Sequence, residues 1–556
     1  MEIDIRLKEW YGWKNYKVEN FDVWFNGYIL NDSLINFFKR GLELLNNKST
    51  KEHSFDDWVR GARGNFSIII TNKEELFCAV DRIRSIPLFY TINSKKISVG
   101  NYIPNIDKNI IINSESYDQQ AALEISMSTY TIGKKTLHPK LYQLCSGELL
   151  ITREGKTKIR TYYQYSPWKT NERSKPTLKK ELTEVSRQVL KDMVENANGG
   201  QIVVPLSAGN DSRFIVSGLR ELGVKNVFCF SYGLNNNFEV ETAEKIAKRL
   251  GYPWLHIPLS IKSQGQSFKE SEFDDFCNFA DTLSNSPILI DYSAVKKIKE
   301  SGKISKDAIF VNGSTGDFIT GGHLLPDSVA NDNEIKDYLI QSIIEKHYSL
   351  WSCLKTTNNI NSIVSELEKI ISKIISDNAL SWSNFAEIGE SMEWSGRQSK
   401  MISTTQRSYE FHGYSWRLPM WDPLYMDFWE SVPKQHKLRQ SLYVETLHEN
   451  NWGGVWNDIS VNNFKIASNN VKLVRNFVKI FFVLFGKEAW HKFDKRAFSY
   501  FIDDTAATAI VPYRDVFFDK RGARNRNSWI VDKYLSEKGI DILYHPKTSD
   551  NFLKFL

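Results

Sequence analysis

The chain of 556 residues is longer than one hydrophobic core supports, so we expect roughly two to four domains. Apolar residues make up 41% and charged residues 25%, which fits a folded globular protein and excludes a disordered or fibrous one. The net charge of +6 is spread over 72 basic and 66 acidic residues without a long block of one sign, so no nucleic-acid partner is expected.

The cysteines and the N-terminal residues indicate in which cellular compartment the protein is expected. The cysteines lie far apart and without CxxC spacing, which favours neither a disulfide framework nor a zinc site; they are Cys78, Cys145, Cys229, Cys277 and Cys353. The N-terminal segment lacks an apolar signal core, and no segment approaches the ~20 consecutive apolar residues of a membrane helix. We therefore expect a cytoplasmic location.

Residues 1–165 are predicted to form a β-rich first domain. Short β-branched or aromatic runs separated by polar turns indicate strands at 67–71, 76–80, 88–92 and 96–100. The polar, proline-containing stretch 166–177 follows them and indicates a linker, with a helical pattern starting near Leu178. An antiparallel sandwich-like layer followed by a domain boundary is the expected arrangement.

Residues 176–470 are predicted to form a second domain. Apolar strands at 202–206, 227–230 and 254–257 alternate with helical segments that end near 222 and 250. This alternation is typical of a parallel sheet with crossover helices. Helical periodicity dominates beyond about residue 335, and residues 471–556 are expected to form a C-terminal helical extension.

One segment of this extension is strongly amphipathic. Apolar residues recur at helical spacing with basic residues between them: Leu473, Val474, Phe477, Val478, Phe481, Phe482 and Phe485, with Lys472, Arg475, Lys479 and Lys487. We interpret it as a core helix with a buried apolar face. The alternative is a peripheral contact with a membrane surface.

The most informative segment is Ser207–Ser212, SAGNDS, between an apolar strand that ends at Leu206 and a predicted helix. Small residues in such a turn let backbone N–H groups approach a phosphate, and the helix N-terminus adds a favourable dipole. The turn lacks the Gly-Lys-Ser/Thr of a Walker A loop and the GxGxxG of a dinucleotide site. An ordinary strand-turn-helix with an Asp-Ser helix start is the alternative.

This turn resembles the pyrophosphate loop, SGGxDS, of the N-type ATP-pyrophosphatases, which cleave ATP between its α and β phosphates. The resemblance implies that Asp211 holds Mg²⁺ against the phosphates and that the rest of the loop binds ATP through Leu206, Ser207, Gly209, Asn210 and Ser212. Ala208 replaces the family's second glycine, which backbone binding tolerates only if φ there is negative.

Later segments resemble asparagine synthetase in particular. Phe230–Gly233, with Glu239 in the next helix, resembles the adenine-side loop and implies nucleotide contacts from Tyr232 and Glu239. Asn312–Asp317, followed by Gly321-Gly322-His323, resembles SGEGSDELFGGY; Gly313 then joins the nucleotide site and Asp317 is the second Mg²⁺ ligand. Carboxylates at the ends of separate parallel strands suit such a site, with helix capping as the alternative.

The resemblance extends in both directions. Residues 416–422 and 429–433 resemble the RxPFLD segment and the helix and proline after it, while 63–67, 81–90 and 144–148 resemble the glutaminase domain. It implies an α/β protein with an N-terminal Ntn-hydrolase-like αββα sandwich. A doubly wound parallel-sheet ATP-pyrophosphatase domain, of the adenine nucleotide alpha hydrolase-like kind, and its helical extension would follow.

The sequence departs from this family at both reaction centres. The glutaminase nucleophile is a Cys exposed by removal of Met, whereas Glu2 stands here and Cys78 lies in mid-strand as a small buried residue. We therefore expect no glutamine hydrolysis, because no thiolate is supplied. In the acceptor half, Ser415 aligns with a family Glu, and the family Lys has no clear match within 434–439.

Four charged residues are candidates for the acceptor half. Glu410, Lys434 and Lys437 could fill the missing roles, although a solvated charge is the ordinary interpretation of each. Arg213 begins the helix after the loop and either points outward or clamps a substrate carboxylate. The catalytic set that we predict is Asp211, Asp317, Arg213 and Lys437.

The expected function is an ATP- and Mg²⁺-dependent ligase that adenylates a carboxylate and transfers ammonia or an amine to it, releasing AMP and pyrophosphate. The missing Cys implies that nitrogen comes from elsewhere, such as a separate glutaminase. Divergent members with these features are associated with surface-polysaccharide gene clusters, which suggests a uronic-acid glycan as substrate. Alternatives are a nucleotide-binding scaffold, a peptide cyclase or a tRNA-modifying ligase; whether the chain forms a homodimer stays open.

Overall fold

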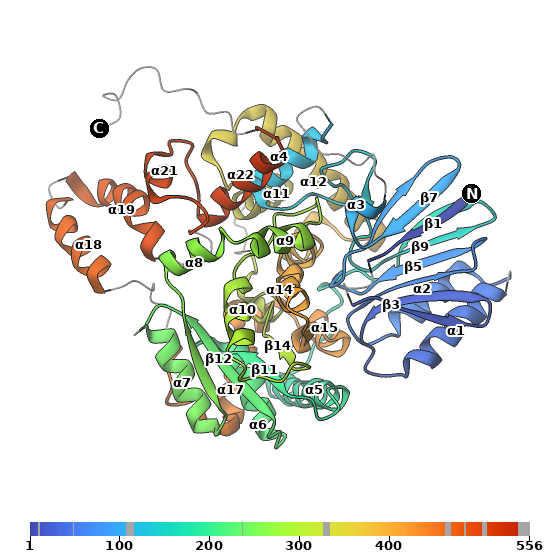
Figure 1. Ribbon diagram of the computed structural model, residues 1–556, viewed down its shortest axis with the longest axis horizontal. Coiled ribbons are helices and arrows are strands. Elements are labelled where there is room, and N and C mark those ends of the chain that lie inside the picture. The colour runs from blue at the N-terminus through green and yellow to red at the C-terminus, as the bar shows by residue number, and fades with distance from the viewer. Residues whose placement is uncertain are drawn as a thin grey trace.

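The computed structural model describes residues 1–8, 12–47, 49–106, 116–235, 237–325, 334–461, 469–482, 485–502 and 509–542. Figure 1 shows a β-rich first part, a second part built on a parallel sheet, and helices that lie above and beside that sheet. The prediction of an α/β protein is confirmed.

The first part contains two sheets. One has the order β1-β7-β6-β8, with bounds Glu2–Arg6, Lys96–Gly100, Phe89–Ile92 and Tyr142–Gln143. The other is antiparallel in the order β10-β9-β5-β4-β3-β2, with bounds Lys156–Thr161, Glu148–Arg153, Leu76–Val80, Phe66–Thr71, Phe21–Gly27 and Lys14–Val18. Helices accompany them: α1 (Leu34–Asn46), α2 (Glu52–Arg60), α3 (Ile103–Ile106) and α4 (Gln119–Ser128).

The two central strands of the larger sheet explain the packing of this part. Every residue of β4, FSIIIT, and of β5, LFCAV, is buried, because each strand is apolar on both faces. Cys78 lies in β5 with no exposed surface, opposite Ile69. The predictions of an antiparallel layer and of a buried Cys78 are confirmed.

The second part is organised by a five-stranded sheet in which all pairs are parallel. Its order is β13-β12-β11-β14-β15, with bounds Trp254–Pro258, Val227–Gly233, Ile202–Pro205, Ile309–Val311 and Ser415–Arg417. The chain runs outward from β11 to β13 and then returns to the other side of β11 at β14. Strand order therefore reverses between β11 and β14, which is where open α/β sheets bind ligands.

Helices cover the sheet and extend beyond it. Those packed on or near the sheet are α5 (Lys175–Asn196), α6 (Asn210–Glu221), α7 (Phe238–Leu250), α10 (Tyr292–Glu300), α14 (Arg407–Phe411), α15 (Pro423–Glu430) and α17 (Ser441–Asn450). Others are α8 (Ile261–Ser267), α9 (Ser271–Ala280), η2 (Phe318–Gly322), α11 (Ile335–His347), α12 (Thr357–Asn378), α13 (Phe385–Glu393), η5 (Trp394–Met401), η6 (Ile402–Gln406) and α16 (Lys434–Lys437). One hydrophobic cluster joins α4 of the first part to α11, α12 and α13.

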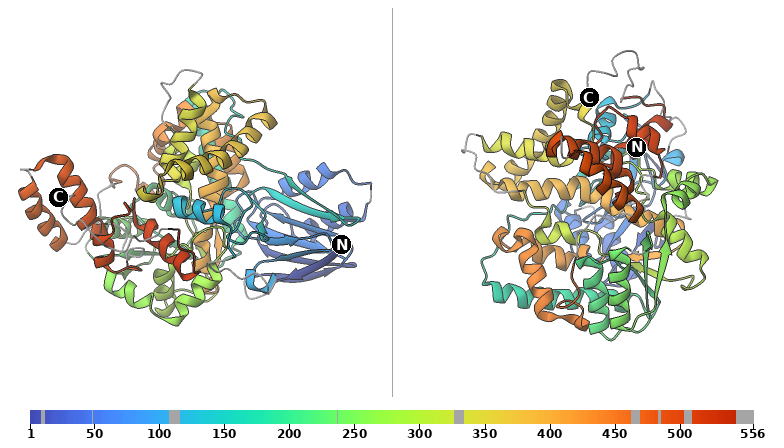
Figure 2. Two further views of the ribbon diagram at one scale, coloured as in Figure 1. Left: turned by 90° about the horizontal axis from the view of Figure 1, so that it is seen from above. Right: turned by 90° about the vertical axis from the view of Figure 1, so that its left-hand side faces the viewer.

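The C-terminal helices are α18 (Asn469–Phe482), α19 (Gly486–Ile502), α21 (Tyr513–Phe518) and α22 (Arg526–Glu537). Figure 2 shows α18 and α19 at one end of the molecule, away from the sheets. The amphipathic helix is confirmed through Phe482, but its interpretation as a core helix is wrong, because Leu473 and Phe477 are mostly exposed. No helix among the described residues is both long enough and apolar enough to cross a bilayer.

Candidate functional site

The turn after β11 is shaped by its own serine hydroxyls. The backbone N–H of Ser207 donates to Oγ of Ser212 at 3.0 Å, and the N–H of Gly209 donates to Oγ of Ser207 at 3.2 Å. Helix α6 then starts with Gly209 at its N-cap and without a side-chain cap. The first N–H groups of a helix have no intrahelical partners, which is what an anion site requires.

Ala208 does not disturb this turn. It is buried, and it is not among the residues with positive φ. The condition under which alanine can replace the family's glycine is therefore met.

The turn after β14 packs directly on the turn after β11; we call residues 207–212 and 312–317 together the loop junction. A Cβ atom on Gly316 would lie 2.2 Å from Cγ of Asp211, and one on Gly313 would lie 2.6 Å from Cβ of Asp211. Both positions thus require glycine. Between them Thr315 has φ of +77°, an unfavourable value for a β-branched residue, and its hydroxyl donates to Gln398 at 2.8 Å.

Asp211 and Asp317 lie together at the loop junction. The backbone N–H of Asp317 and the hydroxyl of Tyr443 both donate to the carboxylate of Asp211, the latter at 3.3 Å. Burial, and then the charge of Asp317, raises the pKa of Asp211 to about 7. Two neighbouring carboxylates of which one is hard to ionise fit a divalent cation, which would relieve their repulsion.

A network behind Asp317 was not predicted from the sequence. His323 contacts Oδ2 of Asp317 through Nε2 at 2.9 Å and Oε1 of Glu393 through Nδ1 at 2.5 Å. Burial disfavours a charged ring, but these two contacts outweigh it and raise the pKa of His323 to about 9. Asp317 is thereby held in place by a positively charged side chain.

Glu393 is the centre of that network. Its carboxylate is buried and accepts from Lys346 at 2.8 Å, Arg397 at 3.3 Å and Gln398 at 3.0 Å. Although burial opposes ionisation, the surrounding cations, first among them His323, hold the pKa of Glu393 well below its usual range. Sequence spacing gave no signal for this group, because its members come from the residue after η2 and from α11, α13 and η5.

The structure differs from expectation at Arg213. Its side chain is fully buried, not outward, and the guanidinium donates to the carbonyls of Ala208 at 2.8 Å, Ile459 at 2.6 Å and Val455 at 3.2 Å. These contacts tie the turn after β11 to the segment after α17. These hydrogen bonds use the guanidinium N–H groups with which Arg213 would otherwise clamp a substrate carboxylate.

Lys437 is likewise buried, whereas a solvated charge was the ordinary interpretation. Its Nζ donates to both carboxylate oxygens of Glu390, at 2.8 and 2.7 Å, and its carbonyl packs against Gly321 of η2. Glu410 contacts Arg407 and accepts from the indole N–H of Trp416 at 2.9 Å. Lys434 lies over the ring of Phe385 at 5.6 Å.

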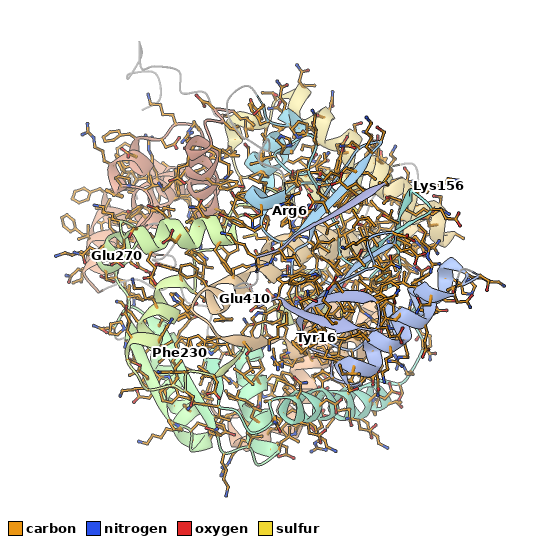
Figure 3. All side chains as sticks on the ribbon, turned by 45° about the vertical axis from the view of Figure 1, so that its right-hand side comes forward. Arg6, Tyr16, Lys156, Phe230, Glu270 and Glu410 are labelled. Atoms are coloured by element: carbon orange, nitrogen blue, oxygen red, sulfur yellow. The ribbon has the colours of Figure 1, made fainter. Side chains whose placement is uncertain are left out.

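The adenine-side candidates lie on β12 and on α7, the helix that follows it. Tyr232 is the last residue but one of β12, and its hydroxyl donates to Asp291 at 2.6 Å. Asp291 also accepts from Tyr409 at 2.9 Å. Glu239 is exposed in the first turn of α7. Phe230 on β12 and Glu410 on α14 are labelled in Figure 3.

Within the described residues, no three His, Cys, Asp or Glu side chains are arranged to hold a metal by themselves. Mg²⁺ commonly takes one or two carboxylates and completes its shell with water and substrate phosphates. Asp211 and Asp317 therefore fit Mg²⁺ bound with a nucleotide better than a metal held by protein alone.

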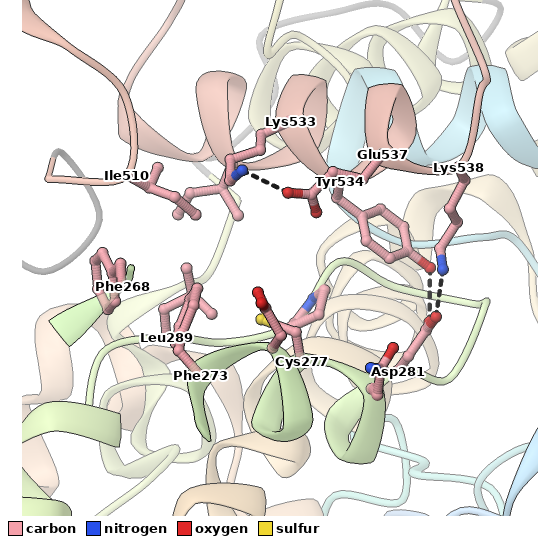
Figure 4. Close-up of a pocket in the computed structure, with 14 residues that line it drawn as sticks. Phe268, Phe273, Cys277, Asp281, Leu289, Ile510, Lys533, Tyr534, Glu537 and Lys538 are labelled. Carbon is pink, nitrogen blue, oxygen red and sulfur yellow. Dashed lines mark hydrogen bonds and ion pairs between the residues drawn. The ribbon is translucent and has the colours of Figure 1, made fainter. Parts of the chain in front are cut away.

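A cavity of about 210 Å³ lies apart from the loop junction, between α9 and α22 (Figure 4). Its charged groups contact each other: Asp281 accepts from Tyr534 at 2.8 Å and pairs with Lys538 at 2.5 Å. Burial raises the pKa of Cys277 in its wall to about 12, so this thiol is not a nucleophile at neutral pH. The loop junction is the stronger candidate.

Comparisons with known proteins give no family assignment. No protein-family model and no curated protein matches the chain. Among solved structures, one match is "Structure of the allosteric regulatory enzyme of purine biosynthesis", with 11% identity over 45% of this chain and 72% of that chain and a TM-score of 0.19. Another is glutamine phosphoribosylpyrophosphate amidotransferase from B. subtilis complexed with ADP and GMP, with 12% identity, 54% and 64% coverage and a TM-score of 0.17. At these TM-scores neither likeness supports an inference.

Proposed function

We propose that this chain is an ATP-dependent, amide-forming ligase of the N-type ATP-pyrophosphatase kind, built like asparagine synthetase. One observation carries the proposal: the uncapped N-terminus of α6, Asp211 and Asp317 meet between β11 and β14, where strand order reverses. Backbone donors and two carboxylates at such a point suit a magnesium-bound triphosphate.

The proposed reaction has two steps. A substrate carboxylate attacks the α phosphorus of ATP and displaces pyrophosphate, while the N–H groups at the start of α6 stabilise charge on the leaving group. Ammonia or an amine then attacks the acyl carbon and displaces AMP. Asp211 and Asp317 would hold Mg²⁺, which supplies positive charge beside the phosphates when bound.

The nitrogen donor is proposed to come from outside this chain. The environment of each of its five cysteines raises the pKa of the thiol, and for Cys145 burial raises it to about 12. None of them offers the thiolate that glutamine hydrolysis needs. A uronic-acid glycan is the proposed acceptor class, and it rests on the sequence resemblance alone.

A nucleotide-binding scaffold is the second candidate. Its supporting observation is that Lys437 and Arg213, two residues expected to face the acceptor, already have buried partners. A chain whose phosphate-binding loop is intact but whose acceptor side is filled by its own side chains could bind ATP without adenylating a substrate.

The test is to identify the nucleotide product. Purified protein with ATP, Mg²⁺, ammonium and a library of carboxylates, including uronic acids, should yield AMP, pyrophosphate and an amide detected by mass spectrometry. ADP and phosphate as the sole products of a preparation free of contaminating ATPase would contradict the proposal. ATP binding without AMP formation across the library would favour the scaffold.

A further inference from the structure

The hairpin of α18 and α19 carries a concentration of exposed apolar side chains. Six of the exposed large hydrophobic residues in the described part of the chain lie between 473 and 485: Leu473, Val474, Phe477, Ile480, Phe481 and Phe485. The others are far apart along the sequence, as is normal for a soluble surface. A contiguous patch of this kind marks an interaction site.

Helix α18 is apolar on two faces, and among the described residues only one of these faces is covered. Val471, Val478 and Phe482 pack with Trp490 and Phe493 of α19. On another face, Leu473, Phe477 and Ile480 recur every three or four residues and are 69%, 62% and 67% exposed. The packing of the hairpin therefore does not account for this second face.

The charge of the hairpin favours one kind of partner. Residues 469–502 contain seven Lys and Arg and two acidic residues, a net charge of +5. Both acidic residues pair within the hairpin, Asp494 with Arg475 at 2.5 Å and Glu488 with Lys492 at 3.0 Å. A second copy of the hairpin would bring like charge to the interface, whereas an anionic lipid surface complements it.

The position of the hairpin permits contact with a flat surface. Figures 1 and 2 show α18 and α19 at one end of the long axis, projecting from the body of the molecule. A bilayer could reach the outer side of α18 without meeting any of the three sheets. The apolar residues and the basic residues of the hairpin would then lie at the depth of acyl chains and headgroups, respectively.

We propose that the α18–α19 hairpin docks the protein peripherally on a membrane surface that contains anionic lipids. Phe477, Ile480 and Phe481 insert at the boundary between headgroups and acyl chains, and Lys472 and Lys479 contact headgroups. The proposal is independent of the ligase chemistry, since no residue of the loop junction takes part.

The experiment is co-sedimentation of the full-length protein with vesicles of phosphatidylcholine alone or mixed with phosphatidylglycerol. Binding should be stronger to the mixed vesicles and weaken at high salt. Phe477→Ser/Phe481→Ser should weaken binding on the order of 100-fold, because two aromatic rings would no longer be transferred from water into the bilayer. Lys472→Gln/Lys479→Gln should weaken binding to the mixed vesicles by roughly 20-fold.

The matched control is Ile35→Ser/Ile92→Ser, which removes two exposed apolar residues from the first part of the chain and should leave binding unchanged. Circular dichroism checks that each variant is folded. Failure of the wild-type protein to bind either vesicle, or equal binding by the Phe477→Ser/Phe481→Ser variant, would overturn the proposal. So would a wild-type dimer in light scattering that this variant converts to a monomer, since the face would then join two copies.

Discussion

The loop junction and the α18–α19 hairpin gather opposite kinds of side chain, carboxylates at the first and apolar rings at the second. At the junction, the half-buried Asp211 lies beside the more exposed Asp317, and Gly313 and Gly316 let two backbone turns close over Asp211. On the hairpin, aromatic rings stand in solvent beside basic residues. Both arrangements are costly for an isolated protein, the first because of charge repulsion and the second because of apolar hydration. A bound partner would relieve each cost, a nucleotide in one and a membrane in the other.

The largest effect should come from the carboxylates of the junction. Asp211→Asn or Asp317→Asn should lower AMP formation on the order of 1,000-fold, because the proposed Mg²⁺ would lose a charged ligand. The measurement is chromatographic separation of nucleotides after turnover. Asp57→Asn, an exposed residue that pairs with Arg60 on α2, is the control. Wild-type turnover by both site variants would place the chemistry elsewhere.

The buried ion pair of Lys437 and Glu390 should contribute to the stability of the fold around the loop junction. Lys437→Met should lower the free energy of unfolding by about 3–5 kcal/mol, because Glu390 would keep a buried charge without its partner. Lys434→Met on the same helix should cost less than about 1 kcal/mol. Urea denaturation measures both.

A double variant distinguishes a role of this pair in stability from a role in catalysis. Lys437→Met/Glu390→Leu should recover part of the lost stability, since neither side then leaves an unpaired charge. Recovered stability without recovered AMP formation would assign Lys437 a role in the reaction. Full recovery of both would limit it to support of the fold.

Close backbone approach at the junction gives a smaller effect. Gly316→Ala should weaken Mg²⁺-dependent ATP binding by about 10- to 100-fold, because the new methyl group displaces the Asp211 carboxylate. Gly265→Ala, in α8 with ordinary packing distances, should leave binding unchanged. Calorimetric titration distinguishes the two. If the Gly316→Ala variant bound ATP as tightly as the wild-type protein, the position of the Asp211 carboxylate would not matter for ATP binding.

The sequence predicted the elements of the fold that depend on local pattern. The strand before Ser207, the glycine-containing turn and the parallel sheet follow from short-range pattern, whereas the pairing of Asp211 with Asp317 was predicted from the resemblance to asparagine synthetase. The partners of Arg213 and Lys437 did not follow, because Ile459 and Glu390 are distant along the chain. Strand β15 was missed as well, since three residues carry no period.

The same limit applies to α18, where the helical period was correct and the burial was not. Helical spacing shows that apolar residues share a face, but only tertiary contacts show whether another element covers it.

The contrast between the covered and the exposed face of α18 gives the last prediction, which has the smallest expected effect. Phe481 is exposed and Phe482 is packed beside Trp490, so two adjacent phenylalanines of one helix report on its two faces. Phe481→Ala should change the free energy of unfolding by less than about 0.5 kcal/mol, and Phe482→Ala should lower it by roughly 1–3 kcal/mol. Thermal unfolding of the lipid-free protein measures both. Equal destabilisation by the two variants would mean that the outer face of α18 is covered within the protein itself, and the hairpin would then have no free surface for a bilayer.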